Sequence, residues 1–381
     1  MSQANDAIMN LTAGWYSVLT TSLSLDESFQ LMQGNDPLGT TSDELWRVMD
    51  IIPPDSCVFI PTGHSGFSDE YHSVIMNLKA QGSEEFKQIL GDSWAEWDSA
   101  KGDLLEKHKG NEVAAFEEWA LGSSLDPSKA SQAKTSLRQK EQDAVSLAVD
   151  RWFKADDPDA MKPYATKIEQ VRSQCQSAPS GQANFDSEKT SSNVEKIRID
   201  SSLGISYDLF SFNASGSYDS LTSKVSSSKL TVDVSFDHFF TVDVTPLSSK
   251  SGGHVPWYYG PALDLAYKNN DNNVWKNSAP TWEDKFGEHG SLRRVVGALV
   301  IVDGIQATIT SEADLDEDDH KTVEAQLDTG YFPFFQASGK GGWENNIDSS
   351  DSGKLVVTTK CKGGNPQILG VNVIPIDEIF Q

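Results

Sequence analysis

Two histidines and two acidic residues lie close together near residue 70, and side chains of these types bind metals or transfer protons. Asp69 and His72 are three residues apart, so they share one face of a helix that begins near Ser68. Imidazole and carboxylate groups bind zinc or iron and also act as general acids and bases. Together with His64 and Glu70, they predict one alternative function, a metal-dependent or acid–base enzyme.

The spacing of these four residues matches no established metal motif, so the sequence assigns neither a metal nor a cofactor. A second interpretation explains the same residues. Acidic side chains are favoured at the positive N-terminal end of a helix, and the histidines then lie on its surface.

A second acidic run, residues 314–320, has aspartates at alternate positions, as a calcium-binding loop does. Such a loop requires Gly at its sixth position and Glu at its twelfth, where this chain has Asp319 and Ala325. We therefore predict that the run is the acidic first turn of a helix.

A group of aromatic residues lies in the irregular segment 247–292, among asparagines and aspartates. Exposed aromatic rings stack on the apolar face of a sugar, while amide groups bind its hydroxyls. The same residues also fit a packed core. The sequence favours a non-catalytic binding or interaction protein whose ligand is a neutral or cationic small molecule or glycan. The candidate ligand-binding residues are Trp257, Tyr258, Tyr259, Trp275 and Trp282.

The segment Phe286-Gly287-Glu288-His289-Gly290 is followed, six residues later, by Gly297-Ala298. This pattern is similar to the aromatic-Gly-Thr-His-aromatic signature and later Gly pair of the perforin-like pore-forming family. Glu288, Gly290 and Ala298 depart from that signature. The match covers residues 286–298 alone and assigns no family, but it implies a further alternative, a membrane-active pore-forming-like protein.

The formal net charge of −25 constrains the partners of the chain. An acidic surface repels phosphates, so we expect no nucleic-acid partner and poor binding to anionic lipids. The longest strongly apolar run, 295–302, is far shorter than the roughly 20 residues of a membrane-spanning helix. Without a recognisable signal peptide, the chain is predicted to be cytoplasmic, and leaderless secretion stays open. The oligomeric state is not indicated.

The hydrophobic pattern changes along the chain, which predicts an α+β fold. Residues 1–176 show helical periodicity with start signals such as Asp126-Pro127, and they predict a mostly helical domain. The Ser-rich segment 177–193 predicts a linker. Residues 194–381 alternate between apolar and polar side chains, which predicts an antiparallel β-rich domain.

This β-rich domain contains a predicted internal repeat, residues 203–246 and 327–375. Lys229-Leu230 in the first copy matches Lys354-Leu355 in the second, and Val242-x-Val244 matches Val371-x-Val373. The matches keep their order, and the extra residues of the second copy fall in Gly- and Ser-rich stretches, where loops tolerate insertions.

The alternation in the first copy also suits a strand that lines a membrane pore, with apolar residues toward lipid and small polar residues toward water. Asp208 lies on the same side as Phe210 and Phe212, where a carboxylate would be unfavourable in lipid. We therefore expect the first copy to stay in a water-soluble sheet, and the protein not to permeabilise neutral liposomes at neutral pH.

Overall fold

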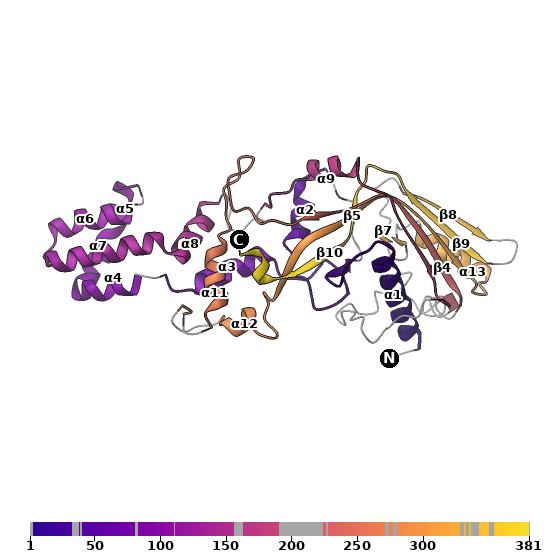
Figure 1. The fold of residues 1–381 in the computed structure, drawn as a ribbon, viewed down its shortest axis with the longest axis horizontal. Helices are drawn as coiled ribbons and strands as arrows, with labels where there is room; N and C mark the ends of the chain where they lie inside the picture. The colour runs from indigo at the N-terminus through magenta and orange to yellow at the C-terminus, as the bar shows by residue number, and fades with distance from the viewer. Residues whose placement is uncertain are drawn as a thin grey trace. The chain divides into compact units, whose positions relative to one another are not determined.

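The computed structural model of the chain has an α+β fold, with a helical N-terminal half and a β-rich C-terminal part, as the change in hydrophobic period predicts (Figure 1). No helix in the described ranges is long and apolar enough to cross a membrane. The structure describes residues 3–380 apart from 33–37, 39, 81–82, 110, 156–162, 190–223, 226–227, 271–273, 277–279, 328–330, 333–334, 337–342 and 350–353.

The large sheet is organised around one long strand, β5 (Arg294–Ser311), which hydrogen-bonds to neighbours on both sides (Figure 1). All strand pairs are antiparallel except β1 and β2, which are parallel. Across the sheet the order is β2 (Val58–Phe59), β1 (Phe29–Met32), β10 (Gln367–Pro375), β5, β4 (Leu230–Asp243) and β3 (Gly181–Asp186), while β9 (Leu355–Cys361) pairs with β5 and with β8 (Trp343–Ser349). A separate hairpin joins β6 (Tyr331–Phe332) and β7 (Phe335–Gln336).

The sheet and its covering helices form the first of two compact units, made of residues 1–66, 163–245 and 294–375. Side chains of β4 alternate between buried and exposed, as its sequence predicts. The buried face packs against α1, where Trp15 and Leu19 share a core with Val232 of β4 and Ile305 of β5. The other helices of this unit are α2 (Ser42–Met49), α9 (Ile168–Cys175) and α13 (Glu317–Leu327), and α1 spans Gln3–Ser22.

The second unit consists of residues 67–162, 246–293 and 376–381. Four of its helices, α4 to α7, enclose a small core in which Phe86, Trp97 and Phe116 meet edge to face. Asp126 caps α7 by accepting hydrogen bonds from two backbone N–H groups, as the Asp-Pro signal predicts. The helices are α3 (Phe67–Asn77), α4 (Ser83–Leu90), α5 (Trp94–Lys107), α6 (Glu112–Gly122), α7 (Pro127–Gln142), α8 (Ala144–Lys154), α11 (Gly260–Lys268) and α12 (Trp282–Phe286).

These units differ from the continuous domains 1–176 and 194–381 that we expected, because each unit contains segments from both halves of the chain. The predicted linker 177–193 also contains a strand, β3, which pairs with β4 along its whole length. Only Ala183 and Phe185 are buried in β3. Two apolar residues are enough at that place, since a neighbouring strand provides the hydrogen bonds that a linker would lack.

The predicted repeat lies partly outside the described residues, which exclude 190–223, so the repeat itself stays a prediction. Its described matches nevertheless occupy corresponding places on the two sides of β5. Val242 of β4 and Val371 of β10 are both paired with Leu299. Residues 230–243 of the first copy form one strand, β4, whereas the described part of the second copy contains β6 to β10.

Candidate functional site

The four residues of the predicted enzyme site have separate partners. His64 belongs to the first unit, where its Nε2 lies 2.9 Å from the carbonyl oxygen of Ile60. His72 belongs to the second unit and stacks on Trp152, with the ring centroids 4.5 Å apart. Asp69 and Glu70 lie in the first turn of α3, as the alternative interpretation predicts. Among the described residues, no group of three His, Cys, Asp or Glu side chains is placed to bind a metal.

Glu70 makes the strongest polar contacts of this group. Its carboxylate accepts hydrogen bonds from Lys285 Nζ at 2.5 Å and from Ser291 Oγ at 2.6 Å. Lys285 is buried, which no pattern in the sequence indicated. A buried ammonium group requires a charged partner, so Glu70 serves to fix α12 and the turn that follows it to α3.

Most of the predicted ligand-binding aromatics lie in the core of the second unit. Trp257, Tyr258 and Trp275 are all 2% exposed or less. Trp257 packs against Tyr71 and Trp152, and Tyr258 donates its hydroxyl hydrogen to a backbone carbonyl. Rings that are enclosed on all sides present no face on which a sugar could stack.

Two members of the aromatic group are partly exposed. The Tyr259 ring lies under the Arg151 guanidinium at 4.5 Å, and Trp282 donates its Nε1 hydrogen to the carbonyl of Tyr267. Both residues already have intramolecular partners. A ligand at this segment therefore stays a prediction, and of the five candidate aromatic residues these two alone offer it a surface.

The segment 286–298 forms a compact turn followed by the start of β5. A Cβ atom at Gly287 would lie 2.2 Å from the Glu283 carboxylate, and one at Gly290 would lie 2.5 Å from the backbone of Lys285. These glycines are thus required by close packing in the turn. His289 is exposed.

The acidic run 314–320 begins a helix, as we predicted. Asp316 lies just before α13, and its Oδ1 accepts hydrogen bonds from the backbone N–H groups of Asp318 and Asp319. Asp319 Oδ2 accepts one in return from the N–H group of Asp316. The aspartates therefore satisfy the free donors of the helix start.

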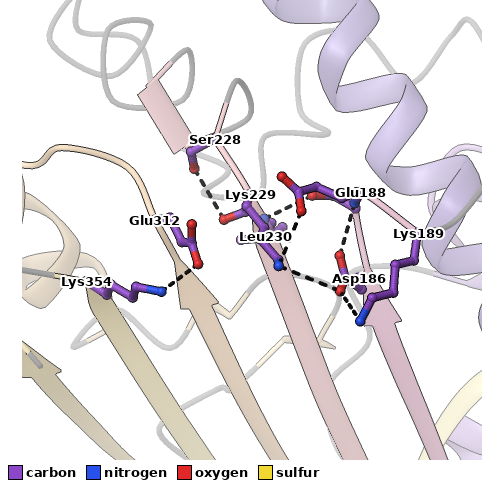
Figure 2. A network of polar contacts seen from close by, with 9 residues as sticks. Asp186, Glu188, Lys189, Ser228, Lys229, Leu230, Glu312 and Lys354 are labelled. Atoms are coloured by element: carbon purple, nitrogen blue, oxygen red, sulfur yellow. Dashed lines mark hydrogen bonds and ion pairs between the residues drawn. The ribbon is translucent and has the colours of Figure 1, made fainter. Parts of the chain in front are cut away.

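The feature that the sequence analysis missed is a group of charged residues at one end of the sheet. Residue pairing places the end of β3, the start of β4, the end of β5 and the start of β9 at this same end. Two long connections therefore leave from it, residues 187–229 and residues 312–354, and they are of equal length. We call the charged group the junction; it consists of Asp186, Glu188, Lys229, Glu312 and Lys354 (Figure 2).

Ion pairs in the junction join neighbouring strands where the connections begin and end. Lys229 Nζ lies 3.3 Å from Glu188, next to β3, and Lys354 Nζ lies 2.5 Å from Glu312, next to β5 (Figure 2). The backbone N–H group of Glu312 also donates to the Lys229 carbonyl at 3.0 Å. The junction thus links the ends of both connections.

The charges of the junction alter one another's protonation. The hydrogen bond from Lys354 lowers the pKa of Glu312, and the hydrogen bond to Glu188 raises the pKa of Lys229. The pKa of Asp186 is lowered chiefly by a hydrogen bond from Lys189. Because these groups are exposed to water, dissolved salt will weaken their pairs.

The sequence did contain a signal for the junction. Lys229 and Lys354 are each followed by a leucine, and the two Lys-Leu pairs are among the residues matched in the predicted repeat. The acceptor Glu312 has no such signal, because only strand pairing brings it beside them.

The chain was also compared with known proteins. No protein-family model, curated protein or solved structure matches it.

Proposed function

We propose that this chain is a membrane-active, pore-forming protein in which the connections 187–229 and 312–354 leave the sheet and enter a lipid bilayer. One observation carries the proposal. Two stretches of equal length, 187–229 and 312–354, begin and end at the same end of the sheet, and each joins two strands that pair with each other, β3 with β4 and β5 with β9. The second stretch also contains β8, which pairs with β9 and would have to leave it on insertion.

The strand pairing supports this function because it supplies templates for hydrogen bonding. β3 and β4 are paired up to Asp186 and Thr231, and β5 and β9 are paired up to Ser311 and Leu355. The first connection can extend the pair of β3 and β4 as a hairpin, and the second can extend the pair of β5 and β9 once β8 has separated from β9. Continued pairing matters in a bilayer, where an unpaired backbone N–H or C=O group costs several kcal/mol.

The sequence of the first connection supports it as well. Apolar side chains alternate with small or polar ones over 203–209, a period that gives an extended segment one apolar face. These residues lie outside the described part of the chain, so this support comes from their sequence alone.

A fall in the pH of the solution is the trigger for insertion in this proposal. At neutral pH the whole chain has a formal net charge of −25, and transfer of charged carboxylates into lipid is unfavourable. Near the isoelectric point of about 4.5 the net charge approaches zero, and a growing share of the carboxylates is neutral. We expect insertion in that range and none into neutral liposomes at neutral pH.

The test is the release of a trapped dye from phosphatidylcholine liposomes, measured from neutral pH to about pH 4. The expected result is no release at neutral pH and rising release as the pH approaches the isoelectric point. Absence of release over the whole range, with the protein still folded by circular dichroism, overturns the proposal.

Acid also loosens many proteins into states that disturb membranes without any defined insertion. Single cysteines carrying an environment-sensitive fluorophore separate the two cases. Labels at 203, 205 and 207 should report lipid and labels at 204 and 206 water, whereas a label at Ser131, exposed on α7, should report water at every pH. Equal responses at odd and even positions would contradict the proposal.

A further inference from the structure

A lysine of the first connection forms ion pairs with the second connection. Lys224 lies in the first connection, and its Nζ is 2.5 Å from Asp319 Oδ2 and 3.5 Å from Asp316 Oδ2. Both aspartates belong to the second connection, at the start of α13. This contact is separate from the junction, whose ion pairs join strand ends within each connection's own pair.

The position of Lys224 is unusual for a cation. The N-terminal end of a helix carries a partial positive charge and disfavours a lysine. Here the carboxylates of Asp316 and Asp319 are held at that end by hydrogen bonds to the helix backbone, and they offer a fixed negative site. The Asp319 side chain is only 12% exposed, so its charge is less screened than those of the junction's outer groups.

Apolar contacts and hydroxyl groups support the same attachment. Val225, next to Lys224, and Val323 of α13 are both fully buried and belong to one hydrophobic core. Ser228 Oγ lies 3.0 Å from Ser311 Oγ at the end of β5. Lys224 and Val225 are therefore held against the second connection by ion pairs and by burial, and Ser228 is held at the end of β5 by a hydrogen bond.

We propose that Lys224 and Asp319 form a latch that fastens the two connections together, so that they leave the sheet as one cooperative step. This inference rests on the proposed function. A contact between two moving parts contributes a coupling free energy, because neither part can move without losing it. Weakening the latch should thus loosen both connections, including the one that carries no substitution.

Hydrogen exchange measured by mass spectrometry tests the latch at neutral pH without any membrane. In Lys224→Glu, amide exchange should become about two- to fivefold faster in residues 313–327, which lie in the other connection. The matched control is Lys321→Glu, which makes the same change of charge on α13, because the ion pairs of Lys321 within the described residues are with Glu317 and Asp318 of its own helix. That control should leave exchange in residues 224–229 unchanged.

Charge reversal supplies the decisive comparison. Asp319→Lys should accelerate exchange in residues 224–229, and adding Lys224→Glu to it should slow that exchange again, since the pair is restored with opposite polarity. Additive effects of Asp319→Lys and Lys224→Glu on the exchange rate overturn the latch. So does an equal acceleration of exchange by Lys224→Glu and Lys321→Glu, each measured in the connection that carries no substitution.

Dye release at about pH 4 from phosphatidylcholine liposomes separates the latch from the proposed function. With the latch, Lys224→Glu releases dye severalfold faster than the unsubstituted protein, and the double variant returns toward it. If the unsubstituted protein releases dye but the charge-reversal cycle shows no coupling, the latch is wrong and the function stands. If coupling is seen by exchange but no variant releases dye, the function is wrong and the attachment is structural only.

Discussion

Leu230 and Leu355 lie opposite the same residue, Ser311, from the two sides of β5. Each leucine is the first residue of its strand, each follows a lysine of the junction, and each is buried. The two long connections therefore end at equivalent points beside the last residue of β5. Because the two leucines have equivalent surroundings, we expect their substitution to lower the free energy of unfolding by similar amounts.

Replacing either leucine by alanine should destabilise the first unit by a similar amount. Both side chains are at most 1% exposed, and truncating a buried leucine costs about 2–5 kcal/mol. Urea unfolding followed by circular dichroism measures this loss. The matched controls are Lys229→Ala and Lys354→Ala, whose side chains are partly exposed and whose substitution should have a much smaller effect. A large loss for one leucine and none for the other would contradict the equivalence.

The aromatic core of the second unit should be far more sensitive at Trp257 than at Trp282. Trp257 has no exposed surface, so Trp257→Ala leaves a cavity and should cost about 3–5 kcal/mol. Trp282 is partly exposed, and Trp282→Ala should cost clearly less. Denaturant unfolding followed by intrinsic fluorescence compares them. Equal and small losses would return Trp257 to the set of candidate ligand-binding residues.

The buried pair of Lys285 and Glu70 predicts a non-additive response. Lys285→Met leaves the Glu70 carboxylate with Ser291 as its remaining partner, and stranding a buried charge costs about 3–5 kcal/mol. Adding Glu70→Gln removes that charge and should recover much of the loss. Thermal unfolding of the two single variants and the double variant measures the coupling. Fully additive losses of stability would show that Lys285 and Glu70 are not energetically coupled.

Glu112 should make the helical core of the second unit sensitive to acid. Burial raises its pKa, but hydrogen bonds and charge from Lys140 and Lys101 outweigh this effect, so the folded pKa lies below the usual 4.5. A lowered folded pKa means that the stabilisation is fully present above the unfolded pKa and is lost as the pH falls through the folded value.

Glu112→Gln should therefore be less stable than the unsubstituted protein at neutral pH, and the difference should shrink as the pH falls below about 4. Urea unfolding at a series of pH values measures it. Lys134 and Glu117 form a comparable but more exposed pair in the same helices, so Glu117→Gln serves as the control and should show a smaller dependence. A difference that stays constant with pH would exclude the ion pairs as its source.

Local signals predicted the parts of the fold that depend on short segments. The alternation of apolar residues over 230–236 predicted β4, and Asp126 with its proline predicted the start of α7. The sheet order was not predictable, because β1 reaches its partner β10 across most of the chain. Burial was equally hidden: Trp257 and Tyr259 are near neighbours of similar type, yet one is enclosed and the other is partly exposed.

The pairing of β1 with β10 has a consequence for synthesis on the ribosome. Residues 29–31 emerge long before their antiparallel partners 370–372. Helices α4 to α7 depend on local contacts and can form while translation continues, at about 5–20 residues per second. Strand β1 must instead wait until β10 has been synthesised before it can form this pairing, with Phe29 and Leu31 lacking part of their burial in the meantime. A nascent chain of this protein is thus a natural client for chaperones that bind apolar segments such as β1.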